Sequence, residues 1–226
     1  MNKRTLFAVG AGAAALALTL VIVSLVGGSS DPASAPPVSE ASSIAGLPQD
    51  GAFLGSPNAP HVLVEYADIQ CPYCAQYATG ILPAIIDRYV RTGKLRLEFR
   101  GLAFIGPDSE TALKIIEASA AQDALWEVVD ALYTRQGKEN GDWVGGAIDG
   151  LADSVPGLDL QAARASAGSA AVASAIAANS RLAREDGIPG TPAFTIRPTG
   201  GTATMLEVKA LDVVSFESAI DSALAG

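Results

Sequence analysis

The sequence predicts an α/β domain in which a central mixed sheet is flanked by helices and carries an inserted helical subdomain. Residues 61–100 have a strand–helix–strand pattern, which is typical of two parallel strands joined by a crossover helix. Residues 193–226 have the pattern of an antiparallel hairpin followed by a helix. A helical block at about residues 105–185 separates these two parts. The expected compact domain covers residues 51–226.

The strand–helix–strand unit begins with the run HVLVEYA at 61–67, which is typical of a strand buried on both faces. Residues 74–91 carry an apolar stripe at helical spacing, and Pro83 is expected to kink this helix. Gly93 is expected to end it. Residues 94–100 alternate between apolar and charged side chains, which predicts a strand with one face towards the core.

The helical block is expected to begin with Asp108 as an N-cap after Pro107. An apolar stripe at residues 125–132 predicts a second helix. Further Ala-rich helices are expected at 145–153, 159–167 and 169–185.

The C-terminal part is expected to return to the sheet. Residues 193–197 have the pattern of a strand, Thr199-Gly200-Gly201 of a turn, and residues 203–208 of the antiparallel partner strand. A closing helix is predicted by the apolar stripe that Val213, Phe216, Ile220 and Ala223 form.

The N-terminal segment is expected to be a membrane anchor. Residues 6–26 contain no charged side chain, and as a helix they would be long enough to cross a bilayer core of roughly 30 Å. Lys3 and Arg4 precede this segment, so residues 1–5 are expected in the cytoplasm and the rest outside it. The alternative is a signal peptide that is cleaved, although its apolar region would be unusually long. Residues 27–50 are rich in Gly, Ser, Pro and Ala and are expected to form a flexible linker.

The charge balance and the residue counts exclude two kinds of site. Fifteen Lys and Arg against 24 Asp and Glu give a net charge of −9, which argues against a nucleic-acid-binding surface. The single histidine, His61, and two cysteines are too few for a zinc site with four Cys or His ligands from one chain, and no metal is expected.

The motif Cys71-Pro72-Tyr73-Cys74 is the expected reactive centre, because it follows a buried strand and opens a helix. Unpaired N–H groups and the dipole at a helix N-terminus stabilise a thiolate on Cys71. Pro72 is tolerated at the first helical position. Cys74, one turn further along, is expected to be the more buried, resolving thiol. A structural disulfide closing so short a loop would add little stability.

Two further features are expected beside the dithiol. Glu65 is the only carboxylate in the first strand and is a candidate proton acceptor for Cys74; the alternative is an ion pair with Arg96 or Arg100. Thr191-Pro192 precedes the strand at 193–197. A cis peptide bond there would turn the chain towards the dithiol and leave a backbone edge for a substrate strand.

Aromatic side chains are candidates for a peptide groove around the dithiol: Tyr73, Tyr77, Phe104 and Trp126. Tyr73 is expected to be exposed because it lies between the cysteines at the helix start. Phe104 and Trp126 are expected to belong to the core instead.

Together these motifs resemble the thioredoxin superfamily, and within it the membrane-tethered, DsbA-like thiol–disulfide oxidoreductases of Gram-positive and actinobacterial cells. The resemblance covers residues 60–226 and rests on VLVEYADIQCPYC at 62–74, GIPGTPAF at 187–194 and the helical insertion between them. It implies the following roles: an attacking Cys71, a resolving Cys74, a cis-proline at Pro192, tuning of reactivity by Thr191 and a buried acid at Glu65. Tyr73 stands where many DsbA proteins have histidine. Cys-Pro-Tyr-Cys is commoner among glutaredoxins, whose fold is too short to explain the insertion.

The resemblance also implies a function and partners. The chain would oxidise cysteines of exported proteins, with no cofactor beyond the Cys71–Cys74 disulfide. A quinone-linked membrane reoxidase, of the DsbB or vitamin K epoxide reductase type, would regenerate it, and the chain would be a monomer. Three other functions stay open: a reductase or isomerase in the same compartment, a tethered peptide-binding or chaperone module without redox activity, and iron–sulfur ligation by dithiols of two chains.

Overall fold

The computed structural model describes residues 43–225. The expected cytoplasmic segment 1–5, the anchor 6–26 and residues 27–42 of the linker lie outside this part of the chain. Between residues 43 and 225, no helix combines the length and the apolar character that a membrane span requires.

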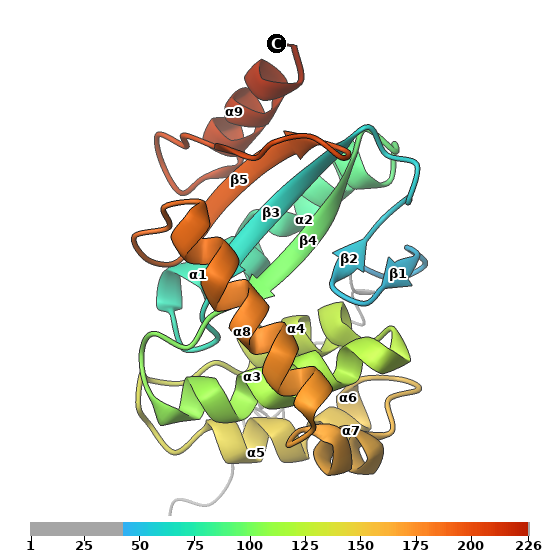
Figure 1. Ribbon diagram of the computed structural model, residues 1–226, viewed down its shortest axis with the longest axis vertical. Coiled ribbons are helices and arrows are strands. Elements are labelled where there is room, and N and C mark those ends of the chain that lie inside the picture. The colour runs from blue at the N-terminus through green and yellow to red at the C-terminus, as the bar shows by residue number, and fades with distance from the viewer. Residues whose placement is uncertain (1–42, 226) are drawn as a thin grey trace, which may run out of the picture. The chain divides into compact units, whose positions relative to one another are not determined.

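A mixed, six-stranded sheet lies at the centre of the described residues, with the strand order β1-β2-β4-β3-β5-β6 (Figure 1). The two central strands, β3 and β4, are parallel, and β3 is antiparallel to β5. The strands are β1 Gln49–Asp50, β2 Phe53–Leu54, β3 His61–Ala67, β4 Leu95–Gly101, β5 Ala193–Pro198 and β6 Thr204–Met205. This topology confirms the predicted mixed sheet, although β6 is shorter than the expected strand at 203–208.

The crossover between β3 and β4 is broken into short helical pieces. They are α1 (Pro72–Gly80), α2 (Leu82–Ile85) and a π-helical turn at Ile86–Val90. The expected kink in this region lies at Ile81, just before Pro83. The proline ring clashes with a carbonyl one turn earlier, so the helix must be interrupted on the N-terminal side of the proline.

The predicted helical insertion is present as a set of helices, most of which lie at one end of the sheet, while the last, α8, crosses one face of it (Figure 1). They are α3 Pro107–Ser119, a 3₁₀ turn at Ala120–Gln122, α4 Leu125–Thr134, α5 Val144–Asp149, α6 Leu151–Ser154, α7 Leu160–Ser166 and α8 Ala170–Glu185. The expectation that Asp108 caps α3 is wrong, because the N-cap is Gly106 and Asp108 lies within the first turn. After β6, α9 (Val213–Ala225) closes the domain.

The two faces of the sheet are covered by different helices. On one face, Leu63 and Ala67 of β3 pack in the main core together with residues of α1, α2 and α9. On the other face, Val62 and Val64 pack with Ala183 of α8, which crosses the sheet in Figure 1. Alternation along β3 therefore places Glu65 on the face that carries α1.

The charged face of β4 is buried as well, so the expectation that only one face of this strand is covered is wrong. Glu98 and Arg100 are 9% and 8% exposed. Arg100 Nε and Arg197 Nη2 each donate to the Glu98 carboxylate at 2.9 Å. Arg100 also donates to the Tyr66 hydroxyl, which donates to Asp186 Oδ2 at 2.6 Å. This network lets α8 cover charged side chains because each charge has a partner.

The folded domain begins earlier than expected. Ile44 is 2% exposed in the core, and Gln49 and Asp50 form β1. Gln49 Nε2 donates to Glu127 Oε1 at 2.6 Å, and the Trp126 backbone N–H donates to Gln49 Oε1 at 3.2 Å. The predicted linker boundary at residue 50 is therefore wrong for residues 43–50. Single anchoring side chains hold this segment, and they leave no periodic apolar pattern.

Replacing Arg100 with Met should lower the free energy of unfolding by about 3–5 kcal/mol, because the buried Glu98 and the partly buried Asp186 would each lose a cationic partner. Arg181→Met is the matched control, since Arg181 pairs with Glu185 at 2.8 Å while both side chains are more than half exposed. The control should change stability by less than about 1 kcal/mol. Urea denaturation measures both variants, and equal losses would contradict the importance of the buried network.

Candidate active site

Cys71 is the N-cap residue of α1, and Pro72 follows at the first helical position. The side chain is 5% exposed, and its thiol donates a hydrogen bond to the carbonyl oxygen of Thr191 at 3.3 Å. A proline at this position costs no helical hydrogen bond, because the first N–H groups of a helix have no partner within it. The sulfur therefore lies between a helix N-terminus and the segment before β5.

The pKa of the Cys71 thiol is lowered from 9.0 to about 6. The largest cause is the hydrogen bond from the Cys74 side chain. Burial opposes the shift, and further hydrogen bonds from the side chain of Thr191 and from the backbone of Tyr73 and Cys74 favour it. Cys71 is therefore largely a thiolate at neutral pH in the reduced protein. A thiolate is the form that attacks disulfides.

Cys74 behaves in the opposite way. The side chain is fully buried, and its pKa is raised, first by burial and then by the hydrogen bond and negative charge of Cys71 and by the charge of Glu65. Cys74 therefore keeps its proton when Cys71 is a thiolate. Both cysteines are free in this structure.

Glu65 is 3% exposed, and its Oε1 has no hydrogen-bond partner among the described residues. Its neighbours in the sheet are Phe99 on β4 and Phe194 on β5. Burial raises the pKa of the carboxyl group to about 8, so it is largely protonated at neutral pH. Its charge also contributes to the raised pKa of Cys74, which places the acid close to the buried thiol.

The alternative ion pair for Glu65 is not found among the described residues. Arg100 binds Glu98, Tyr66 and Asp186 on the other face of the sheet. Arg96 lies over the ring of Phe53, 3.9 Å from its centroid. Glu65 is paired with Phe99 on β4, so the side chains of Arg96 and Arg100 point to the opposite face of the sheet and cannot reach Glu65.

The Thr191–Pro192 peptide bond is cis, as expected, and precedes β5. This loop starts at the end of α8, where Asp186 accepts the hydrogen bond from Tyr66. The buried ion-pair network therefore holds one end of the loop that brings Thr191 to Cys71.

A surface hollow lies directly around Cys71. It is lined by residues 71–73 of the dithiol motif, by Phe104, Ile105 and Glu139 of the insertion, and by residues 189–191. Tyr73 and Phe104 are 63% and 57% exposed at this hollow. The expectation that Phe104 belongs to the core is wrong, whereas Trp126 is 1% exposed in the core as expected. Tyr77 is also buried, against the rings of Phe194 and Phe216, and does not line this hollow.

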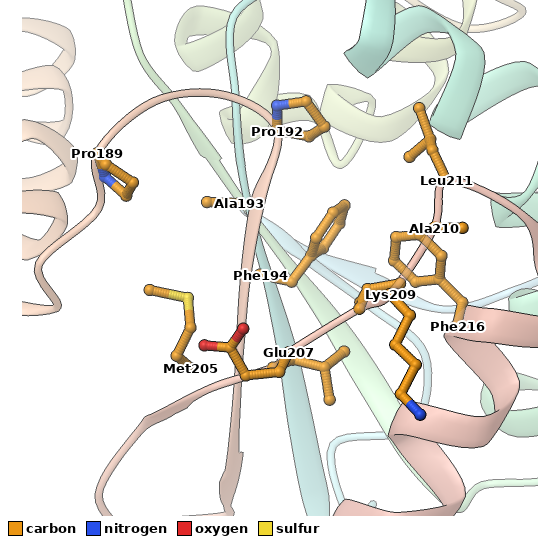
Figure 2. Close-up of a pocket in the computed structure, with 12 residues that line it drawn as sticks. Pro189, Pro192, Ala193, Phe194, Met205, Glu207, Lys209, Ala210, Leu211 and Phe216 are labelled. Atoms are coloured by element: carbon orange, nitrogen blue, oxygen red, sulfur yellow. The ribbon is translucent and has the colours of Figure 1, made fainter.

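A second, apolar groove runs along the other side of the cis-proline. Figure 2 shows Pro192 at one end, with Phe194 of β5 and Phe216 of α9 at its base (Figure 2). The two rings meet edge to face, with centroids 4.9 Å apart. Glu207 and Lys209 lie on the opposite wall of the groove. Together the two hollows give a concave surface on either side of Pro192.

Asp68, three residues before Cys71, is a further buried acid that the sequence did not single out. Asp68 is fully buried, and its carboxylate accepts four hydrogen bonds. Ser109 Oγ donates at 2.6 Å and the Gln70 N–H at 2.9 Å to one oxygen, and the N–H groups of Phe104 and Ile105 donate at 2.7 and 3.0 Å to the other. The carboxylate thus joins the dithiol loop to the segment that carries Phe104 and to α3.

Two amides extend this connection to the loop after α4. Gln136 Nε2 donates to the carbonyl oxygens of Ile69 and Cys71 at 2.8 and 3.0 Å. Gln70 Oε1 accepts from the backbone N–H of Asn140 at 2.7 Å. The only signal in the sequence was the polarity of Asp68 and Gln70 directly after a buried strand, and their partners lie some 40 to 70 residues away along the chain.

The comparisons with known proteins agree with this architecture. The fold and the dithiol at the start of α1 define the class of DsbA-like, thioredoxin-fold proteins with a helical insertion. A family model described as "Thioredoxin" matches residues 48–204, and the chain belongs to this family. Within residues 43–225, no group of three or more His, Cys, Asp or Glu side chains is placed to hold a metal ion.

Similar proteins are found in Bacillus. The chain is 34% identical over 93 residues to "Probable disulfide bond formation protein D" of Bacillus anthracis. This match covers 40% of this chain and 43% of that protein. The chain thus matches less than half the length of that relative. It is 26% identical over 162 residues to "Disulfide bond formation protein D" of Bacillus subtilis (strain 168), covering 70% of this chain and 71% of that protein.

The fold also matches solved structures. The crystal structure of oxidised BdbD from Bacillus subtilis superposes with a TM-score of 0.66 at 22% identity, covering 78% of this chain and 94% of that chain. The crystal structure of Pseudomonas aeruginosa DsbA2 superposes with a TM-score of 0.60 at 26% identity, covering 79% of this chain and 96% of that chain. The predicted thioredoxin fold is therefore confirmed, and the chain resembles DsbA-like proteins as expected.

Glu65→Gln should stabilise the oxidised protein, and the gain should grow with pH. A carboxyl group whose pKa is about 8 in the folded protein and 4.5 in the unfolded chain holds its proton on folding while the unfolded chain releases it, which costs stability above pH 4.5. The expected gain is about 1 kcal/mol at pH 5 and about 3 kcal/mol at pH 7. Urea denaturation at both pH values measures it, and a gain that does not change with pH would contradict the raised pKa. In the oxidised protein neither cysteine titrates, so the difference reports Glu65 alone.

Asp68→Asn should lower the free energy of unfolding by about 2–4 kcal/mol, because the new amide NH₂ would face buried N–H or O–H donors that lose their acceptor. Asp153→Asn is the control, since Asp153 is exposed on α6. The control should stay within about 0.5 kcal/mol of the wild type. Thermal and urea unfolding compare the variants. A loss no larger than that of the control would show that the four hydrogen bonds do not hold the dithiol loop.

Proposed function

We propose that this chain is an extracytoplasmic thiol–disulfide oxidoreductase that acts as a dithiol oxidase and introduces disulfides into exported proteins. The opposite pKa shifts of the two cysteines carry the proposal: the pKa of Cys71 is lowered to about 6, whereas the pKa of Cys74 is raised. A stabilised thiolate in the reduced protein makes the disulfide form a strong oxidant, because reduction is then favourable. The names of the Bacillus relatives, which refer to disulfide bond formation, support the same class of activity.

In the first step, a substrate thiolate attacks Cys71 Sγ of the Cys71–Cys74 disulfide. The new bond joins the substrate sulfur to Cys71, the Cys71–Cys74 bond breaks, and the Cys74 sulfur takes the electron pair. Because the pKa of Cys74 is raised, this sulfur requires a proton to leave readily. Glu65, protonated at neutral pH, is the group proposed to supply it.

In the second step, another thiolate of the substrate attacks the substrate sulfur of the mixed disulfide. Cys71 leaves as a thiolate, which the hydrogen bonds at the start of α1 stabilise. The substrate has then lost two electrons and two protons in all: the protein holds the electrons as a Cys71 thiolate and a Cys74 thiol, one proton replaces the proton that Glu65 gave to Cys74, and the other goes to solvent. The backbone of Thr191 and Pro192, beside Cys71, is the proposed support for the substrate segment.

Regeneration of the disulfide requires an acceptor for these two electrons. We propose a quinone-linked membrane reoxidase of the DsbB or vitamin K epoxide reductase type, as the resemblance implies. Residues 6–26 are the proposed anchor, with residues 1–5 in the cytoplasm and residues 27–42 as the tether. An extracytoplasmic site suits the chemistry, since protein disulfides persist in oxidising compartments.

The test is a titration of the reduced protein, followed by ultraviolet absorbance of the thiolate. One thiolate should appear with a midpoint near pH 6, and Cys74→Ala should move the midpoint upwards, because the hydrogen bond from Cys74 is the largest cause of the low pKa. The stabilisation of the reduced protein by this thiolate is complete above pH 9 and is lost as the pH falls through about 6. Equilibration with glutathione buffers should accordingly give a potential above that of thioredoxin, about −270 mV.

A midpoint near pH 9 with a thioredoxin-like potential would contradict the oxidase and favour a reductase. Reactivation of scrambled ribonuclease by the protein would favour an isomerase. A function that survives replacement of both Cys71 and Cys74 by Ser would indicate a peptide-binding or chaperone module.

A further inference from the structure

We propose that Glu139 makes this site select substrate cysteines that have a basic residue beside them in the sequence. This inference rests on the proposed function and specifies the substrate segment that the dithiol takes. It follows from the composition of the hollow around Cys71, from the way Glu139 is held there, and from the side chains opposite it.

Among the described residues that line the hollow, Glu139 is the only acidic or basic one besides the reactive Cys71, whose thiolate is negative as well. Its neighbour Lys138 does not line the hollow. The remaining lining is apolar, aromatic or small, apart from the reactive Cys71 and Thr191. A substrate segment that reaches Cys71 therefore meets only negative charge in the hollow.

The loop that carries Glu139 is attached to the dithiol loop on both sides. Gln136, three residues before, binds the carbonyl oxygens of Ile69 and Cys71. The backbone N–H of Asn140, one residue after, donates to the buried Gln70. The backbone on both sides of Glu139 is therefore tied to the dithiol loop, and the exposed Glu139 side chain lines the hollow from this anchored loop.

The aromatic side chains in the same hollow favour the same kind of substrate. Tyr73 and Phe104 are more than half exposed, one beside Cys71 and the other on the insertion. Aromatic faces attract the head groups of Lys and Arg, and they also pack against the apolar stems of these side chains. A carboxylate and two exposed rings together form a surface suited to a basic side chain rather than to an acidic one.

The selection would act on the substrate and leave the reactivity of Cys71 unchanged. The groups that lower the pKa of Cys71 are Cys74, Thr191 and the backbone at the start of α1, and Glu139 is not one of them. Removing the charge of Glu139 should therefore change the relative rates of two substrates while the thiolate titration of Cys71 stays the same.

The experiment uses the full chain with Cys74→Ser, so that Cys71 is its only thiol. Two peptides carry a single cysteine activated as a thionitrobenzoate disulfide, and they differ only in a Lys or a Glu beside that cysteine. The Cys71 thiolate forms a bond to the peptide sulfur, the peptide–thionitrobenzoate bond breaks, and coloured thionitrobenzoate leaves with the electron pair. We expect the Lys peptide to react about three- to tenfold faster at low salt, with a smaller ratio at high salt.

Glu139→Gln should lower the ratio of the two rates towards the value that the Cys71 thiolate alone sets, Glu139→Lys should lower it further, and an unchanged ratio in Glu139→Gln would overturn the inference. Asp153→Asn is the matched control: it removes the same charge from an exposed site on α6 that does not line the hollow, and it should keep the wild-type ratio. Equal rates for the two peptides with the wild-type Glu139, or an equal loss of preference in the Asp153 control, would overturn the inference while leaving the proposed function intact. No reaction with either peptide would overturn both.

Discussion

The buried carboxylate of Asp68 is the constraint on which the arrangement of this site depends. It lies between the end of β3 and the dithiol, and it collects donors from the dithiol loop, from the segment at Phe104 and Ile105, and from α3. A buried carboxylate must be fully hydrogen-bonded to be tolerated, so these three parts of the chain are held together by one group. The position of Cys71 relative to the helical insertion follows from this requirement.

The chemistry of the site rests on a division between two environments one helical turn apart. Cys71 lies where hydrogen bonds from Cys74, Thr191 and the backbone at the start of α1 converge on its sulfur, and these favour the thiolate. Cys74 and Glu65 lie beneath it in the core, where burial favours the neutral form of each. The two sulfurs therefore differ in charge at neutral pH: Cys71 favours the thiolate, whereas Cys74 keeps its proton.

The two faces of the sheet contribute to the site in different ways. The apolar face, packed against α1 and α9, buries Glu65 and Cys74 and supplies the rings at the base of the groove beside Pro192. The charged face, covered by α8, uses the network around Glu98 and Arg100 to hold Asp186 at the start of the loop that leads to Thr191. The insertion then completes the rim of the hollow with Phe104 and Glu139.

The sequence by itself determined the order of strands and helices and the dithiol motif, because these depend on local patterns: apolar periodicity, Pro and Gly positions, and two cysteines at the start of a helix. It also indicated Glu65 and Pro192, since a carboxylate in an apolar strand and a proline before a strand are both locally unusual.

Only the tertiary structure decided that Asp68 joins three segments, that Phe104 is exposed and that the charged face of β4 is buried. It also decided that residues 43–50 belong to the domain. Each of these depends on partners far away along the chain, and no local pattern specifies which donors a buried acid will meet or which helix will cover a charged face.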